Sequence, residues 1–175
     1  MCVIIDTNVL SSVFSSKAQD HSEFEPVLNW IFNGKGKIVF GGTQYHNELK
    51  KNGKYVGLFT LLGNKGKVKT VSRDKVDKIQ AKLEKDFPDP KFNDRHLASI
   101  VIASKCNLIC TNDKESYPFL KNSSIYPKGI SKPKIYRGIR NANLINDHNI
   151  VEFCKPNEKL SKENQESLRN MLEQY

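Results

Sequence analysis

The sequence predicts an α/β fold, a three-layer α/β/α sandwich around a mainly parallel central sheet. Short apolar segments rich in β-branched residues alternate along the chain with segments whose apolar residues recur at helical spacing. Strands that alternate with helices form βαβ units, and these units build a parallel sheet. In addition, Asp6 directly follows the first apolar run, so that a buried strand delivers a carboxylate at its C-terminal end. Ligands bind at that end of the strands in such sheets, and we therefore expect chemistry around Asp6.

Five segments have the composition of strands and are separated by turn residues or by helical segments. We expect strands at 2–5, 37–40, 67–71, 107–110 and 133–136. In the third of these, Lys67 and Lys69 alternate with less polar residues. Because lysines at such positions discourage unwanted strand pairing, we place this strand at an edge of the sheet.

Helices are expected between the strands. Pro26 suits the first helical position of the segment 26–32, and the polar stretch before it is expected to be a loop. Thr43 and Asn93 are typical N-cap residues, and Asp94 would then lie in a first helical turn, where the helix dipole favours an acid. We expect helices at 7–16, 26–32, 43–49, 55–62, 74–86, 94–105 and 117–121, and a terminal helix after Ser161.

The 175 residues suit a single domain. We divide the chain into a main part at 1–140 and an extension at 141–175, with the terminal helix packed on the same domain. No apolar run approaches the ~20 residues of a membrane span, and no basic leader precedes the first strand, which favours a cytoplasmic protein. The four cysteines have neither a disulfide framework nor zinc spacing, so we expect reduced core residues. They are Cys2, Cys106, Cys110 and Cys154.

The chain carries a formal net charge of +9, and its basic residues are concentrated in two segments. The segments 50–85 and 121–140 are rich in lysine and arginine, and the second contains no acid. Such stripes suit a polyanion such as nucleic acid, although a lysine-rich solvated surface would look the same. The candidate nucleic-acid contacts are Lys50, Lys51, Lys54, Lys132, Lys134 and Arg137.

Four acids fall at comparable places in the predicted fold. Asp6 ends the first strand, Glu48 lies in the helix after the second, Asp94 starts the helix before the fourth, and Asp113 follows the fourth. Right-handed crossovers would bring them to one crevice, where they stay ionised together only with a cation between them. An all-oxygen site suits Mg²⁺ or Mn²⁺, and such ions activate water for phosphodiester hydrolysis.

The motifs that carry these acids resemble those of PIN-domain ribonucleases over roughly residues 1–140. The resemblance rests on Val-Ile-Ile-Asp-Thr-Asn-Val-Leu at 3–10, Glu48, Asn-Asp-Arg-His-Leu-Ala-Ser-Ile-Val-Ile-Ala at 93–103, and Ile-Cys-Thr-Asn-Asp-Lys-Glu at 109–115. It implies a Rossmann-like sandwich and a metal-dependent endoribonuclease that cuts single-stranded RNA. After residue 121 the chain is longer and more basic than the small toxins of that family.

The resemblance also implies roles for individual residues. It implies metal ligands at Asp6, Asp94 and Asp113, with Glu48 as a further catalytic acid. It implies supporting polar roles for Asn8, Thr111 and Asn112. By the same resemblance, the role would be toxin-like or defence-related, with a protein inhibitor (antitoxin) and a homodimer among the expected partners.

Three alternatives stay open on the sequence alone. Glu115 competes with Glu48 as the fourth acid, and His46 and His96 are read as surface or packing residues beside the acids. The chain could also be a nucleic-acid-binding module that keeps the fold with little or no turnover. A phosphatase-like or receiver-type protein with an aspartyl nucleophile fits less well, because the acids are spread over four elements.

Overall fold

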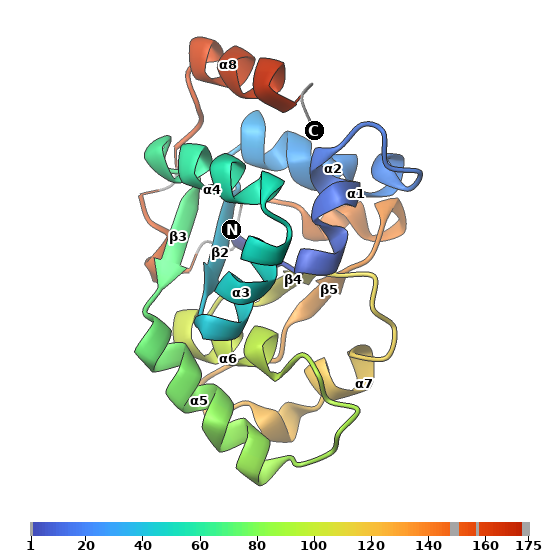
Figure 1. Cartoon of the computed structure of the whole chain (residues 1–175), viewed down its shortest axis with the longest axis vertical. Helices are drawn as coiled ribbons and strands as arrows, with labels where there is room; N and C mark the ends of the chain where they lie inside the picture. Colours follow the sequence, from blue (N-terminus) through green and yellow to red (C-terminus); the bar gives the residue numbers. More distant parts are fainter. Residues whose placement is uncertain (1, 148–150, 157, 173–175) are drawn as a thin grey trace.

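The computed structural model of the chain describes residues 2–147, 151–156 and 158–172 (Figure 1). Its centre is a five-stranded sheet with the strand order β3-β2-β1-β4-β5, and all four strand pairs are parallel. The strands are β1 Cys2–Ile5, β2 Lys37–Gly41, β3 Val68–Val71, β4 Leu108–Cys110 and β5 Lys134–Tyr136. The predicted α/β class and parallel sheet are confirmed, and so is the edge position of the third strand.

Helices fill every connection between consecutive strands. They are α1 Leu10–Phe14, α2 His21–Phe32, α3 Thr43–Lys51, α4 Lys54–Asn64, α5 Arg73–Asp86, α6 Arg95–Ser104, α7 Tyr117–Leu120 and α8 Lys162–Leu172, with short 3₁₀ turns η1 Thr7–Val9, η2 Ser123–Ile125, η3 Ile139–Leu144 and η4 Glu152–Cys154. The chain steps from β1 to β3 in one direction along the sheet and from β3 to β5 in the other. Right-handed crossovers then place α1–α4 on one face and α5–α7 on the opposite face. Figure 1 shows α5, α6 and α7 grouped away from α2 and α4, which is compatible with a Rossmann-like three-layer arrangement.

The core is centred on β1, whose four residues are all buried. A central parallel strand is covered by helices on both faces, so it must be apolar on both. Helix α6 follows the same logic, because eight of its residues are buried and it contacts β1, β2 and β3. Its position under the middle of the sheet fixes where its N-terminal residue Asp94 lies.

Helix α2 departs from the sequence prediction. It begins at His21 and contains Pro26 inside it, where we expected a loop followed by a helix starting at the proline. The extra first turn carries Phe24, which is buried and packs edge-on against the ring of Tyr136 at 6.0 Å between centroids. Tertiary burial of this ring outweighs the backbone hydrogen bond that the proline cannot donate.

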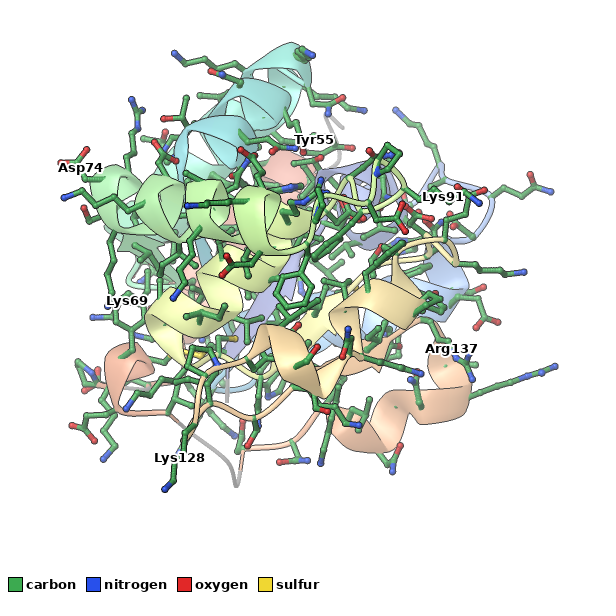
Figure 2. All side chains as sticks on the ribbon, turned by 90° about the horizontal axis from the view of Figure 1, so that it is seen from below. Tyr55, Lys69, Asp74, Lys91, Lys128 and Arg137 are labelled. Carbon is green, nitrogen blue, oxygen red and sulfur yellow. A yellow bond between two sulfur atoms is a disulfide. The ribbon has the colours of Figure 1, made fainter. Side chains whose placement is uncertain are left out.

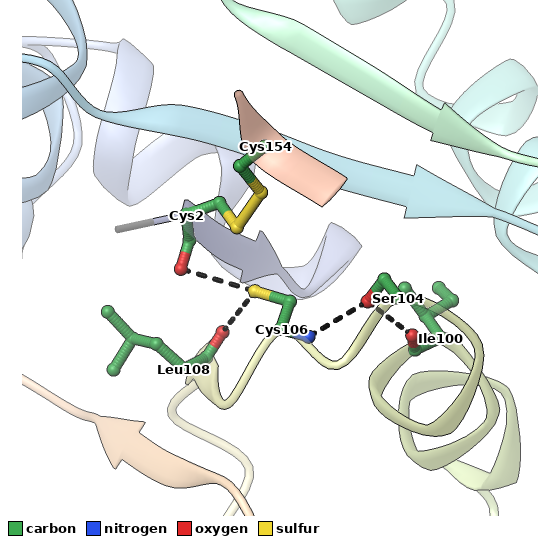
Figure 3. The surroundings of a disulfide bond; sticks show 6 residues. All are labelled: Cys2, Ile100, Ser104, Cys106, Leu108 and Cys154. Atoms are coloured by element: carbon green, nitrogen blue, oxygen red, sulfur yellow. Dashed lines mark hydrogen bonds between the residues drawn. A yellow bond between two sulfur atoms is a disulfide. The ribbon is translucent and has the colours of Figure 1, made fainter. Parts of the chain in front are cut away.

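The expectation of four reduced cysteines is wrong. Cys2, at the start of β1, forms a disulfide with Cys154 (Figure 3). Cys106 and Cys110 are free. The two partners are separated by 152 positions, and local spacing carries no information about such a pair. They meet because the segment after β5 returns to the amino ends of the strands, where Cys154 is fully buried.

Other contacts tie the C-terminal extension to the same end of the sheet. The Lys67 Nζ donates to the backbone oxygen of Glu158 at 3.0 Å, and Arg169 in α8 donates to the side chain of Asn33 at 3.1 Å. None of the helices within the described ranges is long and apolar enough to span a bilayer.

Candidate functional site

Asp6 lies where the strand order reverses. The chain leaves β1 toward β2 and β3 on one side, while β4 and β5 pair on the other side. The Asp6 backbone N–H extends the β1–β4 ladder by donating to Cys110 O at 2.9 Å, so the residues after both strands face one crevice. Such a switch point is the usual ligand site in open parallel sheets.

The Asp6 carboxylate is buried, with 4% of the residue exposed, and two donors hold it. Its Oδ2 accepts a hydrogen bond from Thr111 Oγ1 at 2.7 Å, and its Oδ1 accepts from the Asn8 backbone N–H at 3.3 Å. Burial nevertheless raises the pKa of Asp6 to about 6, and the charges of Glu48 and Asp113 add to the rise. A cation in this crevice would stabilise the ionised form.

Glu48 on α3 is held from three directions. Its Oε2 accepts from Thr7 Oγ1 at 2.8 Å, and its Oε1 accepts from Gln44 Nε2 at 3.0 Å. The His96 Nε2 lies 3.5 Å from the same Oε2. Two neighbouring elements and its own helix therefore aim this carboxylate toward Asp6.

The structure favours Glu48 over Glu115 as the fourth acid. The charge of Glu48 contributes to the raised pKa of both Asp6 and Asp94. Glu115 is exposed, and its backbone N–H donates to Asp113 Oδ1 at 2.9 Å.

Asp94 occupies the N-cap position of α6, one residue earlier in the helix than expected, and Asn93 is not the cap. Its side chain makes no capping hydrogen bond, which leaves the carboxylate available to the crevice. Burial is the main cause of the rise in the pKa of Asp94 to about 7, and the charges of Asp6, Asp113 and Glu48 raise it further. The four predicted acids therefore act on one another electrostatically.

Thr111 connects two of these acids. Its hydroxyl donates to Asp6 and accepts from the Asp113 backbone N–H at 3.1 Å, which places Asp113 beside the crevice. Asn8 contributes its backbone N–H, while its side chain is exposed. Asn112 is exposed, and its side chain forms no hydrogen bond with any residue that the structure describes.

His96 is a buried packing residue, one of the two alternatives that the sequence offered, but its contact with Glu48 was not predicted. It is 1% exposed, and neither ring nitrogen makes a hydrogen bond within the described residues. Burial lowers its pKa, and the nearby Glu48 carboxylate opposes that effect. The sequence held one indication of this contact, because His96 lies two residues after Asp94. Residues at the start of a helix that faces a crevice can both reach that crevice.

The donor set has the chemistry of a hard divalent-ion site, but the ligands are not assembled as one. In the described parts of the chain, no group of three or more His, Cys, Asp or Glu side chains is placed to hold a metal ion. The oxygen-only donors and the raised pKa values of Asp6 and Asp94 fit Mg²⁺ or Mn²⁺ as a group that would relieve their repulsion.

A groove of about 450 Å³ runs from Glu48 between η1 and the junction of α3 and α4. We call it the strand groove; its lining residues are Thr7, Asn8, Ser11, Glu48, Lys51, Asn52, Lys54 and Tyr55. The Lys54 Nζ stands 4.9 Å from the centroid of the Tyr55 ring. Lys51 and Lys54 thus lie beside Glu48, where they suit the phosphates of a single strand, whereas Tyr55 is too buried to stack on a base.

The remaining predicted basic contacts divide between the two ends of the sheet. Arg137, labelled in Figure 2, follows the carboxyl end of β5. Burial raises the pKa of Tyr117, and the charge of Arg137 opposes that rise while the charge of Asp113 adds to it, so Arg137 lies near the crevice. Lys134 pairs in register with Leu108, the first residue of β4, so it and the preceding Lys132 lie at the amino end, away from the acids. Lys50 is exposed on α3 but does not line the strand groove.

No protein-family model matches this sequence, and no curated protein or solved structure is significantly similar to it. The likeness to PIN-domain ribonucleases therefore stays a resemblance of motifs, and the functional argument depends on the acidic crevice and the groove beside it.

Proposed function

We propose that this protein is a metal-dependent endoribonuclease of the PIN type that hydrolyses phosphodiester bonds in single-stranded RNA. One observation carries the proposal: the charges of Asp6, Asp113 and Glu48 add to the rise in the pKa of Asp94. These four carboxylates come from four separate elements. Mutual repulsion of the carboxylates does not stabilise the fold. A divalent cation bound between them would attract each carboxylate and offset their repulsion.

In this proposal Asp6, Asp94 and Asp113 hold Mg²⁺ or Mn²⁺. A metal held there would supply an activated water and would neutralise charge at the scissile phosphate. Thr111 orients Asp6 and Asp113 through its two hydrogen bonds. Thr7 and Gln44 hold the carboxylate of Glu48 at the mouth of the strand groove.

The strand groove supports a single-stranded substrate. Lys51 and Lys54 would contact phosphates, and the polar side chains of Asn8 and Asn52 lie along the same path. In the described part of the chain, Lys155 is the only lysine in an ion pair with a carboxylate, so no acid neutralises the charges of the other described lysines, and these charges favour a polyanion.

Cleavage of an end-labelled single-stranded RNA tests the proposal. The wild type should cut only with Mg²⁺ or Mn²⁺, and Asp94→Asn should lose at least about 100-fold in rate because a ligand of the metal is removed. Glu48→Gln should also lose activity, whereas the exposed Glu115→Gln should cut like the wild type. Equal activity of wild type and Asp94→Asn, with both folded by circular dichroism, would refute the acidic site as the nuclease centre.

A second candidate function is a nucleic-acid-binding module without turnover. It is favoured by the observation that no ligand cluster is assembled among the described residues. A binding module would retain RNA in a mobility-shift assay with or without divalent ions, and would leave a panel of RNAs uncut. The nuclease would show metal-dependent product under the same conditions.

We further propose, from the resemblance alone, a toxin-like role with a protein inhibitor, and a homodimer. Co-purification of a small partner that abolishes RNA cleavage would support the inhibitor. A monomer by light scattering at micromolar concentration would contradict the homodimer.

A further inference from the structure

A second charged cavity lies at the opposite end of the sheet from the acids. It has a volume of about 260 Å³ and opens between the amino end of β2, the turn before β3 and the start of α8. We call it the basic cavity; Lys37, Lys65, Lys159, Glu158 and Ser161 are among its lining residues. Three lysines thus face one acid.

Lys37 is the residue of the cavity that needs an explanation. It is the first residue of β2 and is 5% exposed, and its side chain forms neither a hydrogen bond nor an ion pair with any residue that the structure describes. The other buried lysine, Lys67, differs because its Nζ donates to the backbone oxygens of Gly34 at 2.9 Å and Glu158 at 3.0 Å. The stem of Lys37 is buried, but its ammonium is not one of the fully buried atoms that lack a partner, so the side chain carries its charge into the cavity, where no acid pairs with it.

The electrostatics of the cavity point the same way. Burial lowers the pKa of Lys37, and the charge of Lys69 lowers it further, while Glu158 acts in the opposite sense. Glu158 lies beyond ion-pair distance of Lys37, since no pair between these two described residues comes within 4.0 Å. The cavity therefore keeps an excess of positive charge.

The N-terminus of α8 closes the cavity. Ser161 precedes the eleven residues of α8, and its hydroxyl accepts from the Asn164 backbone N–H at 3.3 Å. The other N–H groups of a first helical turn have no partner within the helix, and the helix dipole adds positive potential there. Phosphate groups bind at helix N-termini of this kind.

We propose that the basic cavity binds the phosphate group of a small phosphorylated ligand. Lys37 supplies a cation at the end of a buried stem, Lys65 and Lys159 flank it, and the start of α8 supplies backbone donors. The site is separate from the acidic crevice and does not depend on nuclease activity.

Phosphate binding to metal-free protein tests this proposal, with inorganic phosphate and a nucleoside 5′-monophosphate as two probes against chloride at equal ionic strength. Both melting temperature and calorimetric affinity are measured. The wild type should be stabilised by phosphate, and Lys37→Met should bind about tenfold or more weakly because a charge-assisted contact is lost. Without phosphate, Lys37→Met should melt no lower than the wild type, since an unpaired charge is removed and methionine can occupy the place of the buried lysine stem.

Two further variants test the rim of the cavity and control for a general loss of surface charge. Lys159→Gln, on the exposed rim, should bind several-fold more weakly without affecting folding. Lys91→Gln is the matched control and should bind phosphate like the wild type. Lys91 lies across the molecule from Lys69, whose charge acts on Lys37 (Figure 2). Tighter binding of the nucleotide than of phosphate, lost in Lys37→Met, would identify a nucleotide as the source. No stabilisation of the wild type by either probe, or equal stabilisation of Lys37→Met, would overturn the proposal.

Discussion

At the scale of single residues, Asp94 links the stability of the metal-free protein to pH. Its folded pKa of about 7 lies above the unfolded value of 3.8, so the folded state holds a proton that the unfolded state releases. Stability from this group is therefore present below about pH 4 and is lost as pH rises toward 7. In the presence of a chelator, Asp94→Asn should melt at least about 3 °C above the wild type at pH 8, and the two should converge at pH 4.

Added Mg²⁺ supplies the check on that prediction. At pH 8 it should raise the melting temperature of the wild type, because it binds the folded carboxylates, and should raise that of Asp94→Asn less. A wild type that melts above the variant across the whole pH range would show that Asp94 is stabilised as an anion without a metal.

Thr111 permits a second test at a buried position. Thr111→Val keeps the volume and removes the hydroxyl that donates to Asp6 and accepts from Asp113. We expect a loss of about 1–3 kcal/mol in the free energy of unfolding, measured in urea, because a buried carboxylate loses a donor. Thr111→Ser keeps the hydroxyl and should lose clearly less. Equal losses in the two variants would mean that the methyl group, rather than the hydrogen bond, accounts for the effect.

At the scale of elements, the turn between β2 and α3 determines where Glu48 is held. Gly42 has a φ of 81°, and a Cβ there would lie 2.5 Å from Val76 Cγ1 on α5. Gly42→Ala should therefore lower the free energy of unfolding by more than about 1 kcal/mol, in a chemical-denaturation measurement. Gly63 in α4 is the control, because a Cβ there meets nothing within 4 Å, and Gly63→Ala should be neutral or stabilising by up to about 1 kcal/mol. A neutral Gly42→Ala would show that α3 can shift freely away from α5.

The elements that the sequence predicted well are those whose pattern is local. The buried run before Asp6 and the alternation around Lys69 each indicate a strand, and both strands were predicted to within one residue, although Lys67 precedes β3 and is buried. The start of α2 was not predictable, because it depends on Phe24 reaching Tyr136, 112 positions further along the chain. In the same way, spacing alone could suggest that the four acids meet, but not that Asp94 is the N-cap of α6 or that His96 is buried against Glu48.

At the scale of the whole molecule, the Cys2–Cys154 disulfide joins the central strand to the C-terminal extension. Alkylation of denatured, unreduced protein should therefore label two thiols, Cys106 and Cys110, and reduction should expose two more. Because the bond closes a loop of 152 positions, Cys154→Ser should lower the free energy of unfolding by about 2–5 kcal/mol. Equilibrium unfolding of the oxidised wild type and of the variant measures this difference.

Cys154→Ser also tests whether the sites at the two ends of the sheet act independently. The disulfide lies at the amino ends of the strands, beside the basic cavity, whereas the acids lie at the carboxyl ends. In Cys154→Ser the start of α8 is still held by Lys67 through the Glu158 backbone, but less firmly, so phosphate affinity should fall several-fold. Metal-dependent RNA cleavage should stay within about twofold of the wild type at temperatures where the variant is folded, since sites this far apart couple weakly. A parallel loss of both activities would instead mean that the sheet transmits the state of its amino end to the acidic crevice.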